Sequence, residues 1–90
     1  MVTVRIVYCA DCGYEPQALE LTRALMLQRR AEFASIELIP FIDGSFEVWV
    51  GDELVHAMER DGGFPAPELI IENLRRQSEV RQGSSPADQA

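Results

Sequence analysis

Residues 2–14 read VTVRIVYCADCGY, and this stretch decides the fold of the chain. Apolar and more polar side chains alternate from Val2 to Tyr8, which is the period-two pattern of a β-strand with one buried face. The strand stops at Cys9 and Cys12, and a helical pattern follows. A C-x-x-C pair between a strand and a helix is typical of a thioredoxin-like redox site, although the same spacing is also half of a zinc site.

The cysteine spacing itself favours redox chemistry. Two thiols three positions apart across the start of a helix can close a small disulfide ring, and the positive end of the helix dipole favours a thiolate there. Asp11 lies between Cys9 and Cys12, and its negative charge would raise the pKa of a nearby thiol. The alternative interpretation of Asp11 is a solvated turn residue. We expect the pair to switch between dithiol and disulfide.

Length, composition and charge exclude several classes of protein. Ninety residues, 47% of them hydrophobic, suit one small domain, which we place at residues 1–77, with a polar, disordered tail at 78–90. The net charge of −7 argues against nucleic acid and anionic membranes as partners. No apolar run approaches the roughly 20 residues of a membrane span, and the N-terminus lacks a secretory signal pattern. We expect a cytoplasmic protein, where a cysteine pair is a functional site rather than a structural disulfide.

The first helix is predicted from about Glu15 to Ala31, with Pro16 in its first turn and Arg29 and Arg30 in its last. Its predicted apolar face consists of Ala18, Leu19, Leu21, Leu25 and Met26. A second strand at residues 35–40 follows, and a strand, a helix and a strand over this length indicate a parallel, right-handed crossover.

The second half of the chain predicts a hairpin and a helix. Strands at 45–50 and 53–57 are separated by Gly51-Asp52, a two-residue connection typical of tight hairpins. A loop at residues 61–65 precedes a helix that starts at Pro67 and carries Leu69, Ile70, Ile71 and Leu74. The predicted fold is α/β (α+β), thioredoxin-like β-α-β-β-β-α, with a four-stranded mixed sheet in the order 2-1-3-4 and two helices on one face.

In this topology the loops at 41–44 and 60–65 would flank the cysteines and form a groove for a disulfide-bearing partner. The alternative is that the glycines serve turn geometry and the phenylalanines fill the core. The predicted groove residues are Tyr8, Gly13, Phe41, Gly44, Gly62, Gly63, Phe64 and Pro65.

The other face of the sheet carries a mixed set of side chains. We expect Arg5 to lie between Glu37 and Glu47 and to pair with either. An open apolar patch would remain beside it, as a candidate homodimer or partner surface. Its residues are Val7, Ile39 and Trp49.

Four segments in order resemble the selenoprotein W-like, or Rdx, family over about residues 2 to 76. They are Tyr8 to Tyr14, Glu37 to Pro40, Gly44 to Val48 and Gly62 to Pro65. The resemblance implies a thioredoxin-like four-stranded sheet and thiol redox chemistry linked to glutathione or thioredoxin. Selenoprotein members of the family carry selenocysteine at the position of Cys12, which suggests that Cys12 attacks first, whereas the thioredoxin pattern assigns the attack to Cys9.

The chain also departs from true thioredoxins. It lacks a tryptophan before Cys9 and a proline directly before Phe46, so we expect a narrow activity on protein thiols or glutathione, with no bound cofactor. One alternative is a non-enzymatic interaction module on the same fold. Another is a metal site, which we do not expect because only Cys9, Cys12 and His56 offer ligands unless a dimer supplies more. His56 is expected in mid-strand, as a packed or surface histidine.

Overall fold

The computed structural model describes residues 2–28 and 33–77. The elements run β1 (Thr3–Cys9), α1 (Glu15–Leu27), β2 (Ser35–Phe41), β3 (Phe46–Val50), β4 (Glu53–Ala57) and α2 (Met58–Asp61), and a last helix spans residues 67–77. The predicted tail at 78–90 lies outside the described residues. So do Arg29, Arg30 and Ala31, at the predicted end of the first helix.

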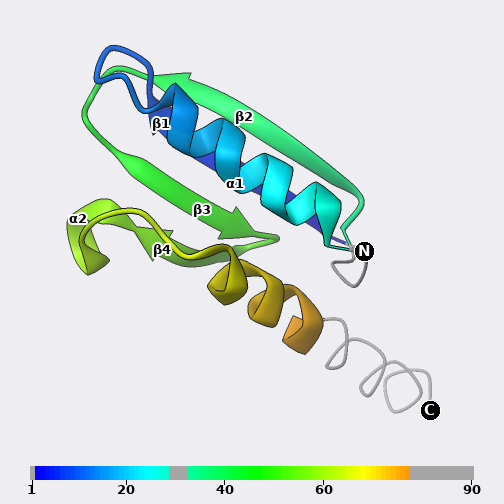
Figure 1. Ribbon diagram of the computed structural model, residues 1–90. Helices are drawn as coiled ribbons and strands as arrows, with labels where there is room; N and C mark the ends of the chain where they lie inside the picture. Colours follow the sequence, from blue (N-terminus) through cyan, green and yellow to red (C-terminus); the bar gives the residue numbers. More distant parts are fainter. Residues whose placement is uncertain (1, 29–32, 78–90) are drawn as a thin grey trace, which may run out of the picture.

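The sheet has the order β2-β1-β3-β4, as predicted. β1 pairs parallel with β2 and antiparallel with β3, and β3 turns back into β4 through the hairpin at Gly51-Asp52. Gly51 has a φ of 61°, a left-handed conformation that glycine adopts without a steric penalty. The mixed four-stranded sheet of the thioredoxin-like class is therefore confirmed (Figure 1).

The core lies between one face of the sheet and the two long helices. Val4 and Ile6 of β1 are fully buried because alternate residues of a strand point to the same face. They belong to one apolar cluster with side chains of β3, α1 and the 67–77 helix. The members from those three elements are Phe46, Val48, Val50, Ala18, Leu21, Leu25, Ile70 and Leu74.

Two helix predictions need correction. α1 ends at Leu27, because Gln28 takes an extended conformation as the chain turns back toward β2. The apolar face of α1 is also narrower than predicted, since Leu19 and Met26 are exposed, as is Leu69 on the 67–77 helix. A single layer of sheet buries only a narrow stripe of each helix, and these side chains fall outside it.

The segment predicted as a loop from residue 60 contains a short helix, α2, that the sequence analysis missed. The backbone N–H of Gly62 donates to the carbonyl of Met58, and a carboxylate oxygen of Asp61 accepts from the backbone N–H of Ala57 at 3.1 Å. The side chain of Asp61, the last residue of α2, thereby caps the start of the same short helix. The loop proper begins at Gly62.

On the uncovered face, the register differs from the prediction for Arg5. Arg5 lies between Glu37 and Trp49, not Glu47, and its guanidinium lies 5.9 Å from the centre of the Trp49 ring. Trp49 in turn donates its indole N–H to Glu47 at 3.0 Å. Val7, Ile39 and Trp49 are each half-buried, and the homodimer predicted through them stays a prediction.

Candidate functional site

Cys9 and Cys12 are joined by a disulfide, with their Cα atoms 5.3 Å apart. Cys9 is the last residue of β1 and is 0% exposed, whereas Cys12 is exposed in the turn that follows. The C-x-x-C sequence therefore forms a bond between a fully buried residue and an exposed one. A thiol from outside can reach only the Cys12 end of it.

Backbone hydrogen bonds hold the turn around the two cysteines. The N–H of Tyr14 donates to the carbonyl of Cys9, and the N–H of Gly13 donates to that of Ala10, both at 3.3 Å. Gly13 has a φ of 78°, which a residue with a side chain rarely adopts. On the other side, the N–H of Ala10 donates to Phe41 of β2 at 2.7 Å. The sheet thus fixes Cys9, and the turn presents Cys12.

Both cysteines precede the helix, which begins at Glu15 as predicted, so the expected effect of the helix dipole on the thiols is weakened. α1 begins at Glu15, its N-cap is Tyr14, and Cys12 lies before both. The dipole effect falls off within about one turn, and the acidic Glu15 opposes the stabilisation of an anion at this end. Asp11 is exposed in the turn, in agreement with its alternative interpretation as a solvated residue.

An aromatic cluster, made of Tyr14, Phe46 and Phe64, lies beside the cysteine turn. The Phe64 ring centre is 5.1 Å from that of Tyr14 and 4.9 Å from that of Phe46, both edge to face. Such pairs are favourable because the positive edge of one ring meets the negative face of the other. The cluster connects the segment after α2 to the residues that follow Cys12.

His56 positions this same segment. It is 4% exposed in β4, and its Nε2 donates to the carbonyl of Gly63 at 2.8 Å, while its Nδ1 lies 3.7 Å from a carboxylate oxygen of Asp61. The hydrogen bond from Arg60, and then that from the N–H of Ala57, lower the pKa of Asp61 from 3.8 to about 2. The prediction of a packed histidine is confirmed. Residues 2–28 and 33–77 contain no group of three or more His, Cys, Asp or Glu that could hold a metal.

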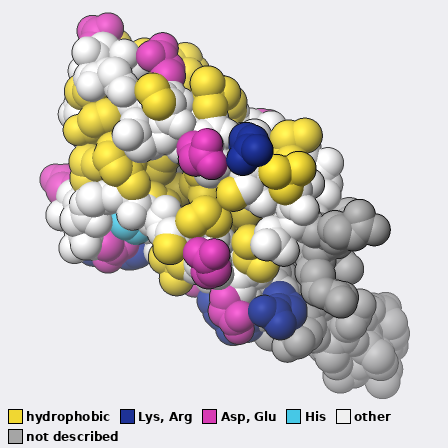
Figure 2. Space-filling view, in the orientation of Figure 1, with side chains coloured by type: hydrophobic (Ala, Val, Ile, Leu, Met, Phe, Trp, Pro, Cys, Tyr) yellow, Lys and Arg dark blue, Asp and Glu magenta, His cyan; other side chains and the backbone are white. Residues whose placement is uncertain are grey.

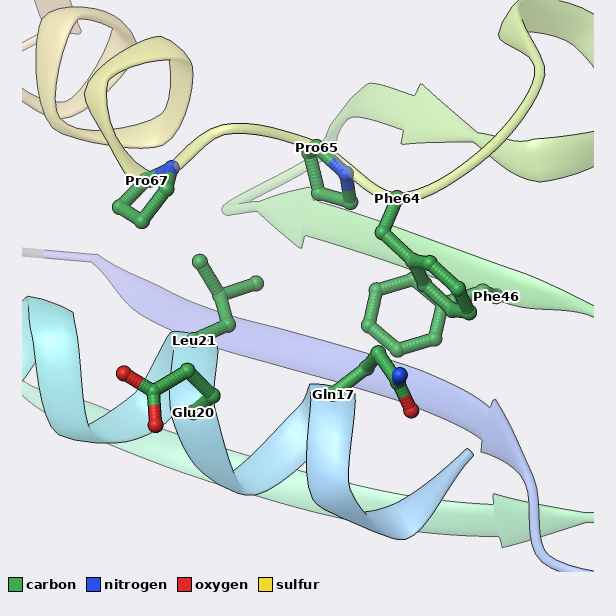
Figure 3. A pocket seen from close by; sticks show the side chains of 7 residues that line it. All are labelled: Gln17, Glu20, Leu21, Phe46, Phe64, Pro65 and Pro67. Carbon is green, nitrogen blue, oxygen red and sulfur yellow. The ribbon is translucent and has the colours of Figure 1, made fainter. Parts of the chain in front are cut away.

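An apolar hollow of about 170 Å³ opens between α1 and residues 64–67 (Figure 3). Leu21 and the ring of Phe46 lie toward the sheet, while Phe64, Pro65 and Pro67 line it from the connecting segment. The space-filling view shows apolar side chains gathered on this face, with acidic groups among them (Figure 2). The hollow is lined by Gln17, Glu20, Leu21, Phe46, Phe64, Pro65 and Pro67.

The structure brings together only part of the predicted groove. Phe64 and Pro65 line the apolar hollow, but Phe41 is exposed at the end of β2, and Tyr8 packs against the core. The groove role of all eight residues stays a prediction. The predicted glycines are exposed in turns with positive φ, which the alternative of turn geometry explains: Gly13, Gly44, Gly62 and Gly63.

The contribution of α1 to the hollow was not predicted from the sequence. Gln17, Glu20 and Leu21 follow the i, i+3, i+4 spacing that places side chains on one helix face. The helical period could therefore have grouped them. It could not have shown that they face Pro67, about fifty residues along the chain, because that depends on tertiary packing.

Residues 3–76 match the model of the Rdx family. This chain belongs to the Rdx family. Migration and invasion enhancer 1 of Bos taurus is 37% identical to it over 79 residues, 83% of this chain and 65% of the relative, so the Rdx chain spans about two thirds of that protein's length. Selenoprotein W of Ovis aries is 38% identical over 68 residues, 70% of this chain and 74% of the relative.

The fold of this Rdx protein also has a counterpart among solved structures. A selenoprotein W-related protein from Vibrio cholerae superposes with a TM-score of 0.77 at 22% identity, over 84% of this chain and 95% of that one. At this identity the likeness shows the fold alone. In the described part of the Rdx chain, no helix has both the length and the apolarity that crossing a membrane requires.

Proposed function

We propose that this Rdx protein is a thiol–disulfide redox protein that works through Cys9 and Cys12. The observation that carries the proposal is the disulfide between a buried and an exposed sulfur at the end of a central strand. A structural disulfide is protected by burying both sulfurs, whereas an exchanging one must offer a sulfur to attack. Family membership is consistent with this chemistry.

The difference in burial supports an order of events in which Cys12 reacts first. In the oxidised protein, an incoming thiolate attacks Sγ of Cys12; the Cys12–Cys9 bond breaks, and Cys9 leaves as a thiolate that takes up a proton. In the reduced protein, the Cys12 thiolate attacks a partner disulfide and releases one partner thiol. Cys9 then attacks Cys12 and releases the second partner thiol. Two electrons and two protons pass to the partner in all.

The partners in this proposal are protein thiols and disulfides or glutathione, with glutathione or thioredoxin as the source of electrons. In a reducing cytoplasm the resting protein would hold its dithiol form, and an oxidised partner would convert it to the disulfide. An antioxidant role follows if the oxidised partners arise from peroxide.

The test is whether the disulfide forms and breaks reversibly. Reduced protein is treated with a mild oxidant, its remaining thiols are blocked, and its mass is measured; we expect loss of two hydrogen atoms and no blocked thiol. Equilibration against glutathione buffers should give a potential of roughly −200 to −270 mV, the range of thioredoxin and glutaredoxins. If both thiols stay available to the blocking reagent, the proposal is wrong.

The competing function is an interaction module that needs no cysteine chemistry. A double variant, Cys9→Ser with Cys12→Ser, separates the two functions because it keeps the fold surface and removes both sulfurs. We expect this variant to lose the biological function of the protein. Full retention of that function would favour the interaction module.

A further inference from the structure

The apolar hollow has the size of a single side chain. Its volume of about 170 Å³ is close to that of engineered protein cavities, about 150 Å³, that bind benzene. Five of its seven lining residues are apolar, and its opening is bordered by Gln17 and Glu20, which are exposed. One leucine or phenylalanine side chain from another molecule would fill it.

The hollow lies within reach of a segment bound at Cys12. Tyr14 is two residues after Cys12 and its ring contacts Phe64, which lines the hollow. Gln17 is one further turn along α1, so its Cα lies at most about 12 Å from that of Cys12. An extended peptide covers this distance with about four residues.

The charges around the site favour a cation. Asp11 and Glu15 are exposed close to Cys12 in the sequence, and Glu20 borders the hollow itself, with Arg23 3.7 Å away from it. The lining of the hollow and residues 11–20 contain no arginine, and the chain has no lysine. Glutathione, with a carboxylate at each end, meets no cationic side chain among these residues.

We propose that the partner of Cys12 is a protein segment that places an apolar side chain in the hollow and a basic side chain beside Glu20. The apolar residue lies within about four positions of the partner's reactive cysteine. This inference rests on the proposed function and narrows its substrate class from thiols in general to protein thiols in this sequence setting.

The chemical step is the exchange described above. The partner's cysteine thiolate attacks Sγ of Cys12, and Cys9 leaves as a thiolate and takes up a proton. A second partner thiolate then attacks the partner's sulfur in the mixed disulfide and releases Cys12. Two partner thiols are oxidised to one disulfide as the protein disulfide is reduced to two thiols.

Short peptide thiols test the proposal against the oxidised protein. Cys-Ala-Ala-Leu-Arg and the reversed order Arg-Leu-Ala-Ala-Cys, both capped, are compared with versions carrying Ala for Leu or Glu for Arg, and with glutathione. Reduction of the protein is followed by acid quenching and mass measurement. Each rate is divided by the rate of the same thiol with 2-hydroxyethyl disulfide, which removes differences in thiol reactivity.

In one of the two orders we expect the Leu-Arg peptide to react about tenfold faster than its Ala version. It should react about threefold faster than its Glu version. Glu20→Lys should reverse the preference between Arg and Glu. Glu72→Lys is the matched control, because Glu72 forms the same i, i+3 pair with Arg75 on the 67–77 helix, and it should change no ratio.

Gln17→Phe, an exposed position on α1, should fill the hollow and abolish the advantage of leucine. Dithiothreitol, too small to use the hollow, measures the intrinsic reducibility of the disulfide in each variant, and it should reduce Glu72→Lys at the parent's rate. Equal normalised rates for every peptide and glutathione would overturn the inference while leaving the proposed function intact, provided that dithiothreitol still reduces the disulfide. A disulfide that no thiol reduces would overturn both.

Discussion

The two ends of the sheet are built from different interactions. At the hairpin end, Gln77 donates its amide N–H groups to Val50, Asn73 and Glu53 at 2.9 to 3.3 Å. Glu53 also accepts from Asn73 and from Arg76. At the cysteine end, three aromatic rings and an apolar hollow take the place of such a network.

The hairpin end stabilises the sheet, whereas the cysteine end is the proposed place of the chemistry. At the hairpin end, polar groups of the 67–77 helix form hydrogen bonds with Val50 of β3 and Glu53 of β4. Few polar groups are therefore left there to bind a partner. The cysteine end exposes one sulfur and part of Phe64, and its segment 61–63 is held from behind by the contacts of His56 with Gly63 and Asp61. The proposed redox site needs this partial opening, and the closed end fixes the sheet that carries it.

The largest effect should come from exchanging one sulfur at a time. With Cys9→Ser, the exposed Cys12 keeps its thiol but nothing resolves a mixed disulfide, so disulfide-linked partners should accumulate in cell extract. With Cys12→Ser, the remaining Cys9 is buried, and few or none should be trapped. Non-reducing gels and mass spectrometry measure the difference. Equal trapping by the two variants would contradict the order assigned from burial.

Within the aromatic cluster, the buried ring should matter more for stability than the partly exposed one. Phe46→Ala removes a fully buried side chain and should lower the free energy of unfolding by about 3 to 5 kcal/mol. Phe64→Ala removes a ring that is 40% exposed and should cost about 1 kcal/mol. Urea unfolding of both variants gives the comparison. Similar losses would show that Phe64 contributes as much to the core as Phe46 does.

At the hairpin end, Gln77→Ala should affect stability alone. The variant removes the donor to the carbonyl of Val50 and should lower the free energy of unfolding by about 1 kcal/mol. The rate at which dithiothreitol reduces the Cys9–Cys12 disulfide should stay unchanged. A slower or faster reduction would mean that the two ends of the sheet are coupled.

The smallest effect should be a pH dependence at the cysteine end. The folded chain lowers the pKa of Asp61 to about 2, so the stability from its carboxylate is complete above the unfolded value of 3.8 and is lost as pH falls toward 2. Asp61→Asn should be less stable than the parent at neutral pH, and this difference in stability should vanish as the pH falls from 3.8 to about 2. Thermal unfolding between pH 7 and pH 2 measures it. Glu59→Gln, an exposed carboxylate on the same α2, is the control and should show no such convergence.

The strands were predictable because their signals are local. Alternation gave β1, the Gly51-Asp52 pair gave the hairpin of β3 and β4, and the crossover gave the parallel pairing of β1 and β2. The position of β3 beside β1 was predicted by analogy with a thioredoxin-like sheet. The end of α1 was not predictable in this way. The residues after Leu27, from Gln28 to Ala31, all favour a helix by propensity, but Gln28 takes an extended conformation before β2.

The neighbour of Arg5 shows a second limit. Arg5 lies opposite Trp49 because of the register between β1 and β3, which are forty residues apart in the chain. Neither strand alone encodes the register. A shift of β3 by two positions relative to β1 would have placed Glu47 opposite Arg5, as predicted. The same holds for the hollow, whose α1 residues face a segment from the far end of the fold.

The sequence by itself determined that two thiols follow a central strand, because strand alternation and C-x-x-C spacing are properties of neighbouring residues. Only the tertiary structure decided that the two sulfurs differ. Cys9 is buried because β2 and the core cover the end of β1, and Cys12 is exposed because the turn carries it away from them. Burial depends on what packs against a residue, and those neighbours come from distant parts of the chain.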